Sequence, residues 1–246
     1  MVTEVQHLNL LPTSRMPLVS ILIINYNDIQ HLIACLTSVK SLAYPNVETT
    51  LVDNASTDGS VEYVKSNYPW VRVVQNKLNL GFAGGNNVGI ASAKGEYFFL
   101  LNVDTEVEAR CLEYLVNAAN SDRTVGICGC KLLLFYKRNV LQSAGGRYSL
   151  VGIPWDRGTY EVDAGQYDEP DEPSFVCESA MLVKKDVVSR IGAFDPAFFM
   201  YNEDVELCLR LWVAGFRVLY VPKAVVYHKW RLDMSRRQKP DFAFHM

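Results

Sequence analysis

Short runs of β-branched and other apolar residues alternate with amphipathic stretches along the first hundred residues, and this alternation constrains the fold more than any other feature. Strand-length apolar runs predict β-strands, and apolar residues that recur with helical spacing predict α-helices. The expected strands cover residues 19–24, 47–52, 71–75 and 97–101. The expected helices cover residues 29–42, 60–67 and 85–93. Such repetition is typical of an α/β fold with a mostly parallel sheet flanked by helices.

The length and charge of the chain narrow the class of protein. The 246 residues, 49% of them hydrophobic, are enough for a substantial core, and we predict one domain over residues 17–230. An arm of residues 1–16 precedes this domain, and a basic and aromatic tail of residues 231–246 follows it. The formal net charge of −3 argues against a protein that binds nucleic acid by broad neutralisation of phosphates.

The cysteines and the apolar runs indicate the cellular compartment of the protein. The six cysteines are scattered in apolar stretches without the paired spacing of metal ligands, so we expect reduced core residues. Nothing reads as a secretory signal, and no apolar run reaches the roughly 18 residues of a membrane-spanning helix. We therefore predict a cytoplasmic protein. Its tail is a candidate for peripheral contact with an anionic membrane, and a solvated terminus is the alternative.

Polar side chains follow each of the four predicted strands. The clusters occupy residues 25–28, 53–58, 79–87 and 102–104. In parallel sheets, ligands bind beyond the carboxyl ends of the strands, because loops and helix N-termini converge there. Polar groups at four strand ends are more than loop composition alone predicts, so we expect a binding site at this edge of the sheet.

The pair Asn102 and Asp104 lies at the end of an apolar run, with a spacing that points both side chains to one side of an extended backbone. Such a pair can hold Mg²⁺ or Mn²⁺, which prefer oxygen ligands and often join carboxylates to substrate phosphates. His228 follows strand-like residues 224–227, and histidine is a common metal ligand. The alternatives are an Asx turn that caps a helix starting near Glu108, and a histidine without a ligand.

The second and third clusters have features of a nucleotide site. Asp53 closes a strand and is placed to accept a hydrogen bond from a ligand such as a pyrimidine N–H; capping of the next helix is the alternative, although Asp58 fits capping better. Residues 81–89 are rich in glycine but lack the G-x-G-x-x-G spacing of a dinucleotide site. Close backbone approach and the following helix N-terminus still favour a phosphate or ribose contact.

The second half of the chain contains an acidic pair and a long loop. Glu203 and Asp204 begin an amphipathic helix after the largely apolar residues 198–201. A carboxylate beside apolar side chains can have a raised pKa and act as a general base, whereas the alternative is a pair that offsets the helix dipole. Residues 145–173 form an irregular stretch rich in Gly, Pro, Asp and Tyr, and a loop of that length is usually functional or mobile.

Together these residues resemble glycosyltransferase family 2, and within it the bacterial rhamnosyltransferase-like and galactofuranosyltransferase-like members. The resemblance extends from Val19 to His228 and rests on motifs in a fixed order. The motifs are VSILIINYN, TLVDNASTDGS, NLGFAGGNN, LLNVD, IGAFDPAFFMYNEDVELCLRLWVAGFRV and YVPKAVVYH. The resemblance implies a GT-A fold, a UDP- or dTDP-linked sugar donor, a divalent Mg²⁺ or Mn²⁺ ion, and inverting transfer to an acceptor hydroxyl in the assembly of cell-surface polysaccharide or glycolipid.

The resemblance also implies roles for single residues. Asp53 would contact the nucleobase, and Asp104 with His228 would hold the metal or the diphosphate. Asp204 would take the proton from the acceptor, with Glu203 as the second catalytic candidate. The other candidates for contact with the nucleotide sugar, of which Asn79, Gly84 and Asn87 would follow the ribose and diphosphate, are Asn25, Asn27, Asn79, Gly84, Asn87, Asn102 and Glu178.

Two positions depart from the family pattern. The D-x-D metal motif reads Asn102-Val103-Asp104, which leaves one charged ligand and predicts weaker metal binding. Glu178 stands where related sequences often have a small residue, so its carboxylate is placed to touch the donor sugar or narrow its pocket. The expected acceptor is a saccharide or a lipid-linked saccharide.

Two other functions stay open at this point. A non-catalytic nucleotide-sugar-binding protein is the first, because Asn102 is compatible with lost turnover. A sugar nucleotidyltransferase is the second, although residues 25–28 lack the Gly-rich, basic loop that would hold a triphosphate.

Overall fold

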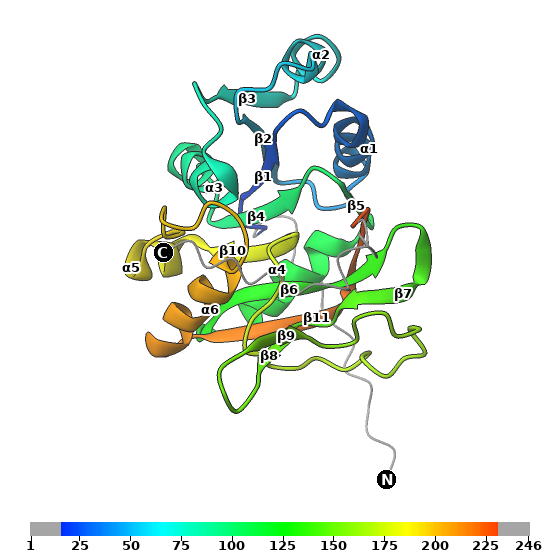
Figure 1. Cartoon of the computed structure of the whole chain (residues 1–246), viewed down its shortest axis with the longest axis vertical. Helices are drawn as coiled ribbons and strands as arrows, with labels where there is room; N and C mark the ends of the chain where they lie inside the picture. The colour runs from blue at the N-terminus through cyan, green and yellow to red at the C-terminus, as the bar shows by residue number, and fades with distance from the viewer. Residues whose placement is uncertain (1–15, 231–246) are drawn as a thin grey trace.

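A nine-stranded sheet extends through residues 16–230, which are the residues described in this computed structural model (Figure 1). Its first part alternates strands and helices as predicted. These elements are β1 (Val19–Asn25), α1 (Ile29–Lys40), β2 (Val47–Asp53), α2 (Ser60–Asn67), β3 (Val71–Gln75), α3 (Gly81–Ser92) and β4 (Tyr97–Asn102). β3, β2, β1 and β4 neighbour one another in this order, and every pairing among them is parallel. Only α3 differs clearly, since it begins at Gly81 rather than at residue 85.

The second part of the sheet mixes strand directions. Its elements are β5 (Thr105–Val107), α4 (Cys111–Ser121), β6 (Val125–Leu134), β7 (Lys137–Ser143), β8 (Gly146–Tyr148), β9 (Pro154–Asp156), β10 (Ala180–Lys184), α5 (Lys185–Ile191), α6 (Glu203–Val213) and β11 (Arg217–His228). β10 runs antiparallel to both β4 and β6, whereas β11 runs parallel to β6. β6 and β11 therefore point the same way as β1 to β4. The mostly parallel sheet is confirmed, and the carboxyl ends of β4 and β11 lie at one edge.

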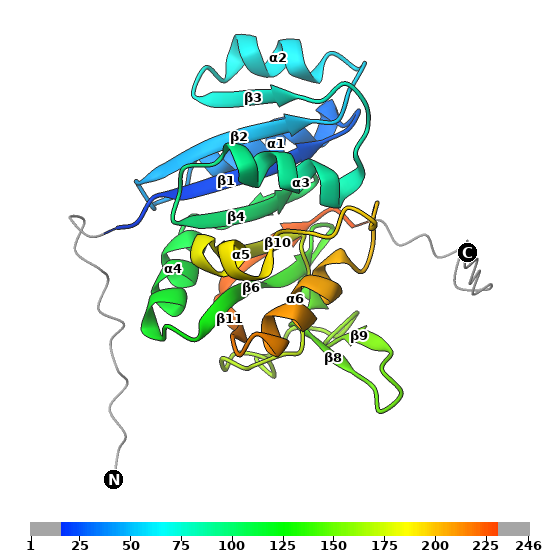
Figure 2. The same ribbon diagram turned by 90° about the vertical axis from the view of Figure 1, so that its left-hand side faces the viewer.

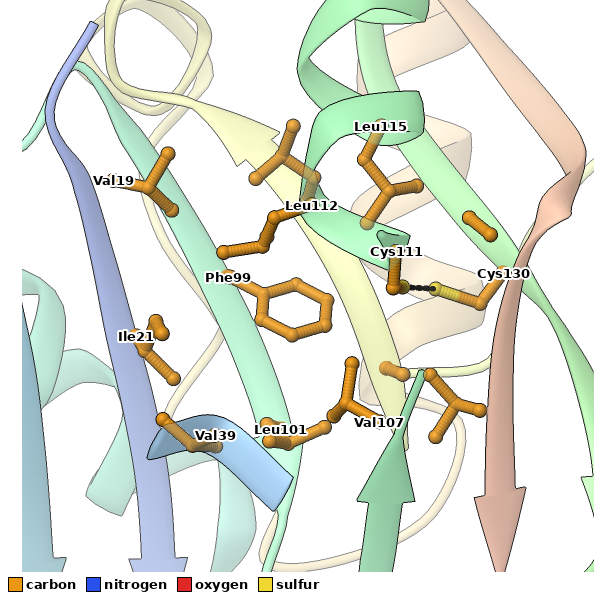
Figure 3. Close-up of a cluster of buried hydrophobic side chains, with 14 of the residues drawn as sticks. Val19, Ile21, Val39, Phe99, Leu101, Val107, Cys111, Leu112, Leu115 and Cys130 are labelled. Atoms are coloured by element: carbon orange, nitrogen blue, oxygen red, sulfur yellow. Dashed lines mark hydrogen bonds between the residues drawn. The ribbon is translucent and has the colours of Figure 1, made fainter. Parts of the chain in front are cut away.

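Helices cover both faces of this sheet (Figure 2). α1 and α4 pack on one face, and α3, α5 and α6 contribute to the cluster on the other. β1 is buried along its whole length, because its alternating side chains meet helices on either side. In Figure 3, Leu112 and Leu115 of α4 lie over Phe99 of β4. These buried apolar contacts hold the strands whose carboxyl ends carry the polar clusters.

The cysteines belong to this core, as predicted. All six are free, and all except the partly exposed Cys177 are buried. Cys111 and Cys130 bring their sulfur atoms to 3.7 Å (Figure 3).

The stretch predicted to be irregular, residues 145–173, contains an antiparallel hairpin formed by β8 and β9. Charges hold much of the stretch in place. The nearly buried Lys131 of β6 forms ion pairs with Asp163 at 2.9 Å and Asp168 at 2.5 Å, and Arg157 pairs with Asp171. Long-range ion pairs leave no periodic signal in a sequence, which explains why the stretch reads as a loop.

The ends of the chain are only partly covered by these observations. Residues 1–15 of the predicted arm and the whole predicted tail, residues 231–246, lie outside the described residues. Within residues 16–230, no helix combines the length and the apolar character that crossing a bilayer requires.

Candidate active site

A pocket of about 480 Å³ opens at the sheet edge where β4 and β11 end. The β8–β9 hairpin, the segment before β10 and the start of α6 complete its wall. Five residues predicted for the site line it, although they come from four distant parts of the sequence. They are Asn102, Asp104, Glu178, Asp204 and His228.

Asp104 and His228 meet in this pocket because β5 pairs antiparallel with β11, placing Thr105 opposite His228. His228 Nε2 lies 3.0 Å from Asp104 Oδ1, and Nδ1 lies 2.8 Å from Gln142 Oε1. Burial acts to raise the pKa of Asp104, but the hydrogen bond and the charge of His228 outweigh burial and leave that pKa below its ordinary value. A carboxylate held in its charged form beside an imidazole can bind a cation.

Asn102 adds a third side chain that can act as a metal ligand. Its Nδ2 donates to Ser179 Oγ at 3.4 Å, whereas its buried Oδ1 has no hydrogen-bond partner. A buried amide oxygen without a partner costs free energy unless a ligand uses it. One unpaired amide oxygen, one carboxylate and one imidazole form a donor set that fits Mg²⁺ or Mn²⁺.

The capping alternative for Asn102 and Asp104 is wrong. β5 intervenes after this pair, and α4 begins only at Cys111, with Arg110 in the capping position. The side chains of Asn102 and Asp104 therefore do not cap the start of α4.

Glu178 and Asp204 form a pair of acidic side chains that line the same pocket. Their carboxylate oxygens and the sulfur of Cys177 all lie within 4.8 Å of one another, and the Glu178 N–H donates to Asp204 Oδ2 at 3.4 Å. Burial raises the pKa of Glu178 well above its ordinary value of 4.5, and the hydrogen bond with Asp204 and the charges of Asp204 and Glu203 raise it further. The raised pKa favours the protonated form of Glu178, which can donate a hydrogen bond to Asp204.

Glu203 differs from its neighbour Asp204. It is fully buried, neither carboxylate oxygen has a hydrogen-bond partner, and it does not line the pocket. Burial raises its pKa, as does the charge of Asp204. Glu203 and Asp204 begin α6, and of these two residues only Asp204 lines the pocket.

The ends of β1 and β2 form a second polar group at the same edge of the sheet. Asn25 Nδ2 donates to Asp53 Oδ1 at 2.9 Å, and the Ser56 N–H donates to Asp53 Oδ2 at 2.9 Å. Asn27 Oδ1 accepts the Thr57 N–H at 2.7 Å. Asp58 accepts the Ser60 N–H at the start of α2, as its capping role predicts. Asp53 is fully buried beneath this loop, and its contact with a nucleobase stays a prediction.

The residues predicted to follow the ribose and diphosphate make local contacts instead of lining the pocket. Asn79 Oδ1 accepts the Gly81 N–H at 2.9 Å. The Asn87 amide bonds twice to the Phe194 backbone, as donor at 2.8 Å and acceptor at 3.0 Å. These contacts explain the side chains structurally, and their ligand contacts stay predictions.

Gln142 is a site residue that the sequence analysis missed. It lies in β7, where a single glutamine within a strand carries no signal of function. Its contact with Nδ1 orients His228, in the way that outer partners orient ligating histidines. Trp155 and Trp230, which also line the pocket, belong to segments whose position only the fold determines.

Comparison with known proteins now decides the family. The sequence model of "Glycosyl transferase family 2" matches residues 20–192. The chain belongs to this glycosyltransferase family. An N-acetylglucosaminyl-diphospho-decaprenol L-rhamnosyltransferase of Mycobacterium tuberculosis is 29% identical over 257 residues, covering 95% of this chain and 82% of that protein. The O-antigen biosynthesis protein RfbC of Myxococcus xanthus is 29% identical over 228 residues, covering 88% of this chain and 18% of that protein.

Solved structures agree with the fold of this family 2 glycosyltransferase. GalNAc-T7, crystallised with UDP, GalNAc and Mn²⁺, is 20% identical with a TM-score of 0.74 and covers 89% of this chain. The mannosyltransferase PcManGT of Pyrobaculum calidifontis, in complex with GDP-Man and Mn²⁺, is 18% identical with a TM-score of 0.68 and covers 94%. The chain spans 45% and 62% of those two chains. The predicted GT-A fold is thus confirmed.

Proposed function

We propose that this family 2 glycosyltransferase moves a sugar, with inversion, from a UDP- or dTDP-linked donor to an acceptor hydroxyl. The observation that carries the proposal is one pocket lined both by a group of side chains that can bind a cation and by a pair of carboxylates. The related transferases crystallised with a nucleotide ligand and Mn²⁺ support the same arrangement. A base and a leaving-group site on opposite sides of a sugar suit a direct displacement.

Asp104, His228 and the free oxygen of Asn102 would hold Mg²⁺ or Mn²⁺. When bound, such an ion neutralises charge that develops on the departing diphosphate. Because Asn102 is uncharged, Asp104 is the single carboxylate of this group, and the ion would be held more weakly than by two carboxylates.

The donor nucleotide would lie toward the ends of β1 and β2. Asp53 closes β2 and its carboxylate is a candidate acceptor for the N3–H of uracil or thymine. Asn25 and Asn27 hold the loop around it. A purine would need more room at this end.

Asp204 would act as the general base that takes the proton from the acceptor hydroxyl. Glu178, whose raised pKa favours its protonated form, would donate a hydrogen bond to Asp204 and hold that carboxylate in place. Glu203 lies buried behind the pocket and would support the helix start rather than touch substrate.

The acceptor would be a saccharide carried on a lipid, in the assembly of a cell-surface polysaccharide or glycolipid. The mycobacterial relative is named for a decaprenol-linked acceptor, and the Myxococcus relative for O-antigen biosynthesis. Asp104, Asp204 and His228 in one pocket favour a catalyst over a protein that only binds nucleotide sugars.

A ligand screen tests the donor. The melting temperature would be measured with UDP, dTDP, ADP and GDP, each with and without Mn²⁺, because a ligand of the folded state raises apparent stability. UDP or dTDP with Mn²⁺ should give the largest rise. Equal rises with all four nucleotides would contradict the assignment. A transfer assay with the stabilising UDP- or dTDP-sugars then separates an enzyme from a binding protein.

A further inference from the structure

The tip of the β8–β9 hairpin is the most exposed apolar feature of the described residues. Leu150 is 108% exposed, Val151 81% and Ile153 62%. No charged residue lies between Arg147 and Asp156. Isolated apolar residues on a surface are ordinary, but three at one turn without an adjacent charge indicate a surface that contacts something.

The hairpin holds this tip firmly. Ser149 and Ile153 close the turn through a backbone hydrogen bond of 2.9 Å, and Gly152 takes the positive φ of 80° that the turn requires. At the base, the Tyr148 ring packs on Phe175 and its hydroxyl donates to the Val205 carbonyl at 3.2 Å. Figure 2 shows the loop between β8 and β9 projecting beyond the body of the protein.

The tip adjoins the mouth of the pocket. Pro154 and Trp155, in the strand that leaves the tip, line the pocket directly. Met200 and Tyr201 line it from the segment before α6 and are 50% and 72% exposed. The pocket therefore has a polar floor and an apolar rim, and the hairpin tip continues this rim outward.

We propose that the hairpin tip inserts into an anionic phospholipid bilayer and sets the pocket mouth against the membrane surface. The inference rests on the proposed function, because a lipid-linked acceptor would present its sugar at that surface. A projecting tip of three side chains offers far less area than the roughly 800 Å² per partner that stable protein interfaces bury, whereas insertion among lipid chains needs no large complementary face.

The net charge of the C-terminal residues also favours contact with an anionic bilayer. Trp230 lines the pocket, so the chain beyond it starts at this mouth. Residues 231–246 carry four basic and two acidic side chains. A net positive segment in the same chain complements anionic headgroups.

Co-sedimentation of the full chain with vesicles tests the proposal. Vesicles of equal parts phosphatidylglycerol and phosphatidylcholine would be compared with pure phosphatidylcholine. The test variant is Leu150→Ser with Val151→Ser and Ile153→Ser. The matched control is Leu209→Ser with Val213→Ser, which removes exposed apolar side chains from the outer face of α6.

The unchanged chain should bind the anionic vesicles, the hairpin variant should bind at least about tenfold more weakly, and the α6 control should bind like the unchanged chain. Absence of binding by the unchanged chain, or equal binding by the hairpin variant, overturns the proposal. An equal loss in both variants overturns it as well, because the effect would then be general.

A second measurement separates this proposal from the proposed function. Transfer to a water-soluble acceptor without a lipid chain should be the same for the unchanged chain and the hairpin variant, since the tip side chains lie outside the pocket. If the hairpin variant loses this soluble transfer, the tip acts in the pocket and the membrane role is overturned. If neither chain transfers sugar, the proposed function fails, and the vesicle result still decides the membrane contact.

Discussion

The two sides of the pocket are built in different ways. On the proposed donor side, β1 to β4 pair in parallel and are held by apolar side chains buried against the helices. On the proposed acceptor side, residues 137–176 carry a short hairpin, and ion pairs of Lys131 and Arg217 tie this segment to the body. Arg147 and Arg157 form ion pairs within the segment. We infer that the parallel strands β1 to β4 would hold the nucleotide rigidly. Residues 137–176 would open more readily, and their sequence can differ between enzymes with different acceptors.

Asp204→Asn should lower the rate of transfer without weakening donor binding. The amide keeps the size of the side chain but cannot accept a proton at neutral pH, so kcat should fall by about 10²- to 10⁴-fold with the donor Kd nearly unchanged. Steady-state kinetics and calorimetry with UDP would measure both. Glu203→Gln is the control and should cost less. Near-full turnover of Asp204→Asn would mean that another residue is the base, with Glu203 and Glu178 next in order.

Phe99→Ala should damage the donor-side frame as a whole. The ring is fully buried between β1, β4 and α4, and its loss should lower the free energy of unfolding by about 3–5 kcal/mol (Figure 3). Urea unfolding would show a lower midpoint with an unchanged slope. A loss below about 1 kcal/mol would show that the core of this half is less tightly packed than the structure indicates.

Asp104→Ala should show that the two sides meet at the cation group. Removing its single carboxylate should weaken Mn²⁺-dependent UDP binding by about tenfold or more, since even outer partners of a metal site are worth that much. His228→Ala should have a smaller effect, because it leaves the carboxylate of Asp104 in place. Calorimetric titrations of UDP at fixed Mn²⁺ would rank the two variants. Unchanged Mn²⁺ dependence in Asp104→Ala would place the cation elsewhere.

Lys131→Met should loosen the acceptor side alone. The methionine keeps the apolar stem but leaves Asp163 and Asp168 without their partner, at a cost of about 1–3 kcal/mol, because Asp168 remains largely exposed to water. Limited proteolysis should then cut residues 145–173 faster, while unfolding of the donor side changes little. Arg110→Met, which breaks an ion pair at the start of α4 and outside residues 145–173, is the control. Equal cleavage of both variants would end the distinction between the two sides.

Glu178→Gln should give the smallest effect, a pH-dependent change in stability. Because burial raises the pKa of Glu178 well above 4.5, the folded chain keeps this proton at pH values where the unfolded chain has lost it. The unchanged protein therefore loses stability as the pH rises above about 5, and the glutamine variant does not lose this part. The melting temperature of the variant relative to the unchanged protein should rise as the pH increases above about 5. A difference that stays constant with pH, as for the exposed Glu62→Gln control, would contradict the buried proton.

The first half of the fold could be read from the sequence to within a few positions. β1 and β4 are buried along most of their length, as is the second half of β2, and this burial explains their apolar runs. β3 lies at the end of the strand order and is mostly only partly buried. Each strand is followed by a polar cluster because it ends at the open edge of the sheet. That pattern is local, so it identified Asp53 and Asp104 as residues at strand ends. It also separated Asp58, which caps α2, from Asp53.

Only the tertiary structure decided which of these residues share a pocket. Asp104 and His228 are 124 positions apart and meet because β5 pairs with β11, and Glu178 reaches Asp204 because α6 begins beside the segment before β10. Gln142 likewise depends on the pairing of β7 with β6, and the exposed hairpin tip depends on the pairing of β8 with β9. Periodicity records which face of an element is buried, whereas the partner across the sheet follows from strand order, which no local pattern of residues encodes.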